Sequence, residues 1–126
     1  MTVPFEYAVL RVVPRIERGE SINGGVVVYC RDLDYLGARV HLDAGRLRAL
    51  DPGADVEAVA AALQSVAGTC EGTGRAAGED IGRRFRWLVA PRSTVVQAGP
   101  VHTGLTSDPA AETERLLELL VHPVSG

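Results

Sequence analysis

The chain has 126 residues, the length of one domain that a single hydrophobic core can serve. Its composition, 46% apolar and 23% charged, is typical of a globular protein, and its net charge of −3 argues against general binding to nucleic acid or anionic membranes. No run approaches the roughly 20 apolar residues of a membrane span, and the start "MTVPFEYAVLRVV" lacks a basic secretory signal, so we expect a cytoplasmic protein.

Three strands are predicted before the first helix. Residues 5–13 ("FEYAVLRVV") and 24–30 ("GGVVVYC") are rich in branched and aromatic side chains, and residues 36–42 ("LGARVHL") alternate in character. Pro14 should end the first strand because it has no amide donor. Residues 43–55 are predicted to connect the third strand to a helix, with at most one short helical turn of their own.

The clearest helix covers residues 56–68. Its apolar side chains recur every three to four positions, Asp55 is a suitable N-cap and Gly68 a suitable end. Residues 69–82 ("TCEGTGRAAGEDIG") combine glycines with polar residues, which predicts an exposed, mobile loop.

The remaining chain is predicted to contain two strands and a second helix. Residues 83–90 ("RRFRWLVA") alternate in character and residues 94–98 ("TVVQA") are apolar, so both are predicted to be strands, whereas residues 99–104 are predicted to be irregular. The last helix begins with Asp108 as its cap and Pro109 in its first turn.

This order, βββαββα, predicts a single α+β domain over residues 1–126 with its core in residues 5–121. We expect a two-layer sandwich in which two helices pack on one face of a mostly antiparallel five-stranded sheet. Strand alternation would place Trp87 in the core. Cys30 and Cys70 lack a CxxC partner or an adjacent histidine, so we expect reduced thiols, unless the fold joins them in a disulfide.

The stretch "RVVPRIERGESINGG", residues 11–25, places many charged and amide side chains between two strands. All 13 basic residues of the chain are arginine, whose planar fork suits carboxylates and phosphates. Alternation puts Arg11 on a partly apolar face, where it needs an anionic ligand or a carboxylate partner such as Glu17 or Glu20. A charged surface connection is the alternative interpretation.

A second polar stretch, "RRFRWLVAPRSTVVQAGPVHTG", covers residues 83–104. It supplies guanidinium, hydroxyl, amide and imidazole groups at strand ends and in loops, where binding sites usually form. We predict that both stretches border one arginine-rich pocket for a phosphate, nucleotide or carboxylate group, in a non-catalytic binding module. The predicted ligand-binding residues are Arg11, Arg15, Arg18, Asn23, Arg86, Arg92, Ser93, Thr94, Gln97, His102 and Thr103.

Other functions are weighed against this binding module. Ser93 has no nucleophile elbow, the histidines lack metal-ligand spacing and there is no P-loop, so no metal or cofactor is expected. A small enzyme is the main alternative, in which His102 or Glu20 transfers a proton while Arg18 and Arg92 orient an anionic substrate. A homodimeric scaffold joined through an edge strand is a third possibility.

Residues 5–121 resemble the bacterial family catalogued as domain of unknown function 3037. The resemblance rests on the patterns "RxxPRxERxExxN" and "RFRWLxAPRSTxxQxxPxHTG" and on the closing "LLELLV". The chain departs from the family at Gly24, where a branched residue is frequent. The resemblance implies a small cytoplasmic protein and assigns no reaction. Because members are often encoded beside a HipA-like kinase protein, it also implies such a protein as a partner.

Overall fold

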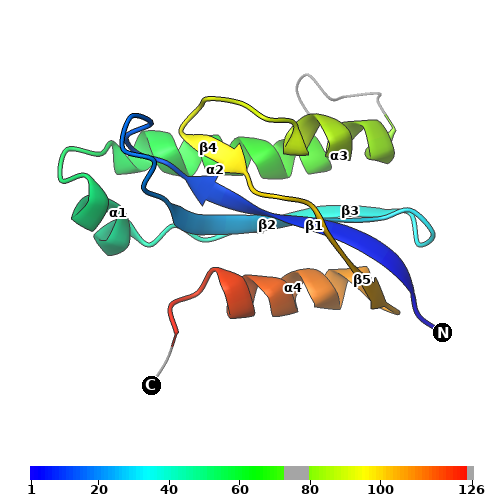
Figure 1. Ribbon diagram of the computed structural model, residues 1–126. Helices are drawn as coiled ribbons and strands as arrows, with labels where there is room; N and C mark the ends of the chain where they lie inside the picture. The colour runs from blue at the N-terminus through cyan, green and yellow to red at the C-terminus, as the bar shows by residue number, and fades with distance from the viewer. Residues whose placement is uncertain (73–79, 125–126) are drawn as a thin grey trace.

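The computed structural model describes residues 1–72 and 80–124, which form five strands and four helices (Figure 1). The α+β class predicted from the sequence is confirmed. In chain order the elements are β1 (Val3–Val12), β2 (Ile22–Cys30), β3 (Tyr35–Val40), α1 (Ala44–Leu50), α2 (Val56–Cys70), α3 (Ile81–Val89), β4 (Val96–Ala98), β5 (His102–Thr106) and α4 (Pro109–Leu120).

The strands form one antiparallel sheet in the order β3-β2-β1-β4, and β5 also pairs with β1. β4 and β5 share one edge of β1, because β4 pairs with residues 10–12 and β5 with residues 3–7. The predicted five-stranded antiparallel sheet is therefore confirmed. Residues 99–101 connect the two halves of this edge.

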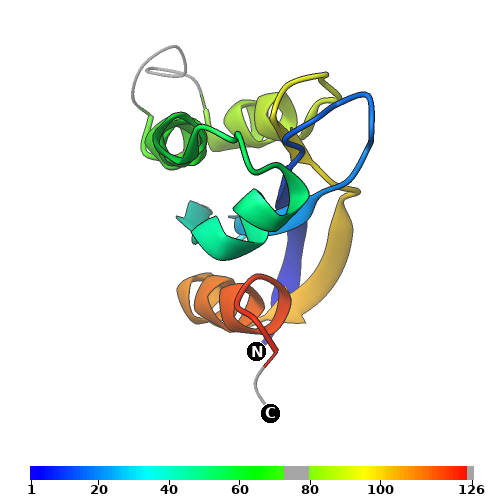
Figure 2. The same cartoon turned by 90° about the vertical axis from the view of Figure 1, so that its left-hand side faces the viewer.

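Helices cover both faces of the sheet, so the predicted placement of two helices on one face is wrong. α2 and α3 lie on one face and α4 lies on the other (Figures 1 and 2). The reason lies in β2, whose Val27 belongs to the core beneath α2 and α3, whereas Val26 and Val28 belong to the core beneath α4. A strand that is apolar on both faces needs cover on both.

The predicted strand over residues 83–90 is instead the helix α3. Asp80 caps its first turn by accepting the backbone N–H of Arg83 at 2.9 Å. Phe85 and Leu88 are buried, and their spacing of three residues suits a helix. The branched and aromatic residues around them also suit a strand, so the local pattern fits both. The helical period turns Trp87 outward, where it is 44% exposed, so its predicted place in the core is also wrong.

Smaller differences concern the connections. The segment before α2 contains the seven-residue helix α1, and residues 102–104, predicted to be irregular, begin β5. Of the predicted mobile loop 69–82, the first two residues belong to α2 and the last two to α3, while residues 73–79 lie outside the described part of the chain. The predicted caps Asp55 and Asp108 are confirmed.

The ladder between β1 and β2 contains a bulge at Gly24. The register shifts between Leu10 and Arg11, which brings an extra residue of β2 into the ladder. A Cβ atom at Gly24 would lie 2.9 Å from Cγ2 of Val12 and 3.2 Å from Cδ1 of Leu63. The side chains of β1 and α2 therefore fill the space that a branched residue would take at this position.

Candidate functional site

The two polar stretches lie side by side in the folded chain. The backbone N–H of Val13 donates to the carbonyl of Val95 at 2.7 Å, and Arg11 pairs with Gln97 in the β1–β4 ladder. Their arginines nevertheless lie in a charged loop and at two different hollows, and not in the single pocket predicted from the sequence.

The arginines of the loop between β1 and β2 are paired with nearby carboxylates, two in the loop itself and one at the end of α1. Arg15 approaches Asp51 at 3.4 Å and Glu17 at 3.6 Å, and Nε of Arg18 donates to Glu20 at 2.5 Å. The hydrogen bond and charge of Glu20 raise the pKa of Arg18, and those of Arg18 lower the pKa of Glu20. This loop therefore matches the alternative interpretation, a charged surface connection.

Asn23 has a structural contact. Its side-chain amide donates to the carbonyl of Leu120 at 2.9 Å, at the last turn of α4. Carbonyls at the end of a helix have no partner within the helix, so Asn23 satisfies one of them and ties α4 to β2.

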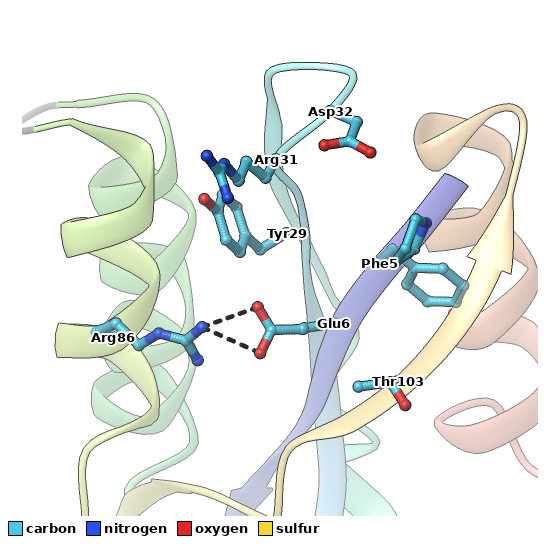
Figure 3. Close-up of a pocket in the computed structure, with 8 residues that line it drawn as sticks. Phe5, Glu6, Tyr29, Arg31, Asp32, Arg86 and Thr103 are labelled. Atoms are coloured by element: carbon cyan, nitrogen blue, oxygen red, sulfur yellow. Dashed lines mark hydrogen bonds and ion pairs between the residues drawn. The ribbon is translucent and has the colours of Figure 1, made fainter. Parts of the chain in front are cut away.

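The largest of the hollows described here lies between α3 and the ends of β1, β2 and β5 (Figure 3). We name it the polar hollow. Its volume is about 640 Å³, within the range of small-molecule sites. It is lined by Pro4, Phe5, Glu6, Tyr29, Arg31, Asp32, Arg86 and Thr103.

Charges in the polar hollow are balanced. Arg86 extends from α3 and its Nη2 donates to both carboxylate oxygens of Glu6, at 3.1 and 2.9 Å (Figure 3). Arg31 and Asp32 follow β2 and have no ion pair among the described residues. Two cations thus face two anions. Of the lining residues, the sequence predicted only Arg86 and Thr103.

A second hollow, which we name the β4 hollow, has a volume of about 340 Å³ and lies between the end of α3 and β4. Its lining contains one cation and no acid. The lining residues are Val89, Pro91, Arg92, Gln97, Ala98, Gly99, Pro100 and Val101.

Arg92 is held in position at the β4 hollow without a carboxylate. Its Cζ lies 4.4 Å from the ring centroid of Trp87, and Nη2 donates to the backbone carbonyl of the same residue. A guanidinium has five N–H donors, so most of those on Arg92 have no partner in the described part of the chain. The stacked ring restricts the orientation of these donors.

Arg11 approaches the same segment from the β1 side. Its guanidinium lies on the backbone of Gly99, where an added Cβ would be 3.1 Å from Cζ. Arg11 is exposed, and its side chain has no hydrogen bond or ion pair with the described residues. The carboxylates considered as its partners, Glu17 and Glu20, pair with other arginines of their own loop.

Hydroxyl and amide groups shape the turn before β4. Oγ1 of Thr94 donates to the carbonyl of Val96 at 2.8 Å, and Nε2 of Gln97 donates to the carbonyl of Thr94 at 2.8 Å. The amide oxygen of Gln97 has no hydrogen bond with residues 1–72 or 80–124. Ser93 is exposed beside them.

The two candidates for proton transfer lie far apart. His102 pairs with Tyr7 in the β1–β5 ladder, with ring centroids 5.3 Å apart, whereas Glu20 precedes Ile22, which pairs with Val12. Tyr7 and Val12 are five positions apart on β1, which corresponds to roughly 16 Å. None of the hollows described above is lined by both residues.

Histidines provide one further contact. His41 and His122 stack with centroids 4.5 Å apart, and His122 lies 4.0 Å from Glu118. Within residues 1–72 and 80–124, no group of three or more histidine, cysteine, aspartate or glutamate side chains could hold a metal ion. Over the same residues, no helix combines the length and the apolar character needed to cross a membrane.

Comparison with known proteins leads to one family. No curated protein and no solved structure matches the chain. The family model described as "Protein of unknown function (DUF3037)" matches residues 7–121, which include every described strand and helix in whole or in part. The chain therefore belongs to the DUF3037 family.

Proposed function

We propose that this protein is a non-catalytic binding module that takes an anionic group, a phosphate or a carboxylate, at the β4 hollow. One observation carries the proposal. Arg92 lines the hollow, Arg11 lies against Gly99 at its border, and neither arginine has a carboxylate partner among the described residues. Because no carboxylate neutralises these two guanidinium groups, both can attract an anion.

Electrostatics favours the β4 hollow over the larger polar hollow. In the polar hollow an incoming anion would meet Glu6 and Asp32 as well as Arg31 and Arg86. Two unit charges 4 Å apart interact by about 1 kcal/mol in water and about 4 kcal/mol near a protein surface. The repulsion by two carboxylates therefore offsets most of the attraction there, whereas the β4 hollow contains no acid.

A backbone donor adds to the β4 hollow. The N–H of Gly99 donates to the carbonyl of Val9 at 2.8 Å. Because neighbouring residues of a strand direct their polar groups to opposite sides, the N–H of Ala98 faces away from β1, toward the open edge. Ala98 lines the hollow, so an anion can receive a neutral N–H donor together with the guanidinium of Arg92.

A binding role also agrees better with the chemistry of these groups than the enzyme alternative does. Arginine stays protonated at neutral pH and cannot act as a general acid or base. His102 begins β5 opposite Tyr7, whereas Glu20 lies in the loop at the other end of β1, so the two residues do not form a proton-transfer pair.

The test is a titration with inorganic phosphate, followed through the Nε–Hε signals of the arginines by NMR. We expect saturable shifts for Arg11 and Arg92, and weaker binding by about tenfold in Arg11→Gln and in Arg92→Gln, since a hydrogen bond to a charged group contributes about 1.5 kcal/mol or more. Arg31→Gln is the control, because Arg31 is also without an ion pair but lines the polar hollow.

Two results would overturn the proposal. One is the lack of a saturable response to either phosphate or citrate. The other is loss of binding in Arg31→Gln with full binding in Arg92→Gln, which would assign the anion to the polar hollow instead.

A HipA-like kinase protein is the partner that the family resemblance suggests. Light scattering of the purified protein with such a kinase protein tests this part of the proposal, and a complex weakened by Arg92→Gln would support it. The same measurement on the protein alone tests the homodimer alternative.

A further inference from the structure

A groove runs along α2, between this helix and the segment that contains Val95. One hollow of about 320 Å³ lies at the start of the helix and a second of about 230 Å³ lies at its end. Both are lined by Ala62 of α2 and by Val95 on the opposite wall, so they are two parts of one depression, which we name the α2 groove.

The α2 wall of the groove is built from small side chains. Ala58, Ala62, Ser65 and Thr69 all line it, and their spacing of four, three and four residues puts them on one helical face. From residue 55 to residue 69 a helix rises about 21 Å, which suits about 14 helical or six extended residues of a bound segment.

The ends of the α2 groove carry opposite charges. Asp51 and Asp55 line the first end, and Arg92 lines the other beside Trp87. Asp51 is paired with Arg15 at 3.4 Å. Among the described residues, the side chain of Asp55 meets only the first turn of its own helix, and Arg92 has no carboxylate partner. Between the ends the walls are largely apolar.

We propose that the α2 groove docks a short apolar segment of a partner protein, with a basic residue beside Asp51 and Asp55 and an acidic residue beside Arg92. The opposite charges at the two ends favour a segment with charges at both of its ends, and they fix the direction in which it lies. The half-exposed Trp87 is the kind of aromatic side chain that dominates protein interfaces. The inference goes beyond anion binding and does not rest on it. The two sites share Arg92, but Arg11 does not line the groove and the apolar walls of the groove do not line the β4 hollow.

The test is selection from a tryptophan-free library of random 12-residue peptides displayed on phage. We expect the selected peptides to share an apolar centre with a basic residue at one end and an acidic residue at the other. Trp87 is the single tryptophan of the chain, so its emission should shift to shorter wavelength when a synthetic copy of a selected peptide covers it. Failure to enrich such sequences, or enrichment of a different pattern, overturns the proposal.

Matched variants locate the bound peptide. Ala62→Arg, at the shared centre of the groove, should weaken binding at least about tenfold. Ala61→Arg, at the exposed neighbouring position outside the groove, should change the affinity less than about twofold. Ser65→Arg is a second groove variant at an exposed site, and circular dichroism checks that all three fold. Equal effects of Ala61→Arg and Ala62→Arg would contradict the proposal.

Two further measurements distinguish a bound partner segment from a bound anion and from a second copy of the chain. Arg11→Gln should weaken phosphate binding about tenfold and leave peptide affinity unchanged, so the two proposals can fail independently. If the protein instead forms a dimer that Ala62→Arg dissociates, a second copy fills the groove and the proposed partner segment is wrong.

Discussion

Arg86 and Glu6 form an ion pair between α3 and β1, with Nη2 of the arginine donating to both carboxylate oxygens at 3.1 and 2.9 Å. The two residues are 80 positions apart in the chain. This pair closes one side of the polar hollow and is the reason that Arg86, although predicted as a ligand-binding residue, is already neutralised.

The contribution of this pair to stability should be small. The arginine side chain is 59% exposed and the glutamate 27%, so water and salt screen the attraction. In a double-mutant cycle with Arg86→Gln and Glu6→Gln, we expect a coupling free energy of about 0.5 kcal/mol, measured by urea unfolding. The coupling should decrease in 1 M salt. A coupling that is large and independent of salt would contradict this prediction.

Asn23→Ala should destabilise the last turn of α4. The substitution removes the amide that donates to the carbonyl of Leu120. We expect a loss of about 1 kcal/mol in the free energy of unfolding and faster hydrogen exchange at the end of α4. Ser21→Ala, an exposed position just before β2, is the control and should change neither quantity. Unchanged exchange in Asn23→Ala would show that this bond does not hold the helix.

The buried thiol of Cys70 should make stability decrease at alkaline pH. Burial raises the pKa of Cys70 from 9.0 to about 12, against the charge of Arg84, which lowers it. The thiol therefore titrates in the unfolded chain first, and the stability it contributes is complete below pH 9 and is lost as the pH rises toward 12. Urea unfolding at several pH values should show a weaker decline over this window in Cys70→Ala, with a difference in slope of at most about 1.4 kcal/mol per pH unit.

Parallel slopes for the two proteins would contradict the prediction for Cys70. The same burial should also protect the thiol from alkylation at pH 8 until the protein unfolds.

Gly24→Val should destabilise the protein through overpacking. The new side chain would meet Val12 and Leu63, which already lie 2.9 and 3.2 Å from the Cβ position. We expect a cost of about 1 to 3 kcal/mol in urea unfolding. Because the cost arises from Leu63 in part, the double variant Gly24→Val with Leu63→Val should cost less than the sum of the single variants. Strict additivity would show that contact with Leu63 is not the cause.

Much of the fold was predictable because its signals are local. The apolar run of β2, the capping residues Asp55 and Asp108 and the stripe of α4 each depend on residues within a few positions of one another. α3 was missed because Phe85 and Leu88 fit a helical period, while the alternation around Trp87 also fits a strand. Only packing against the sheet decides between the two periods.

The sequence by itself determined which residues could bind an anion, since the kinds of side chain and their place between strands are visible in it. The apolar run of residues 24–30 is visible in it too, although the helices that cover both faces of this strand were predicted on one face only. Only the tertiary structure decided which arginine is neutralised: Arg15 meets Asp51 36 positions away, whereas Arg11 and Arg92 meet no acid among the described residues. The physical reason is that the strength of a charge interaction depends on distance. For residues far apart in the chain, strand register and helix placement set that distance.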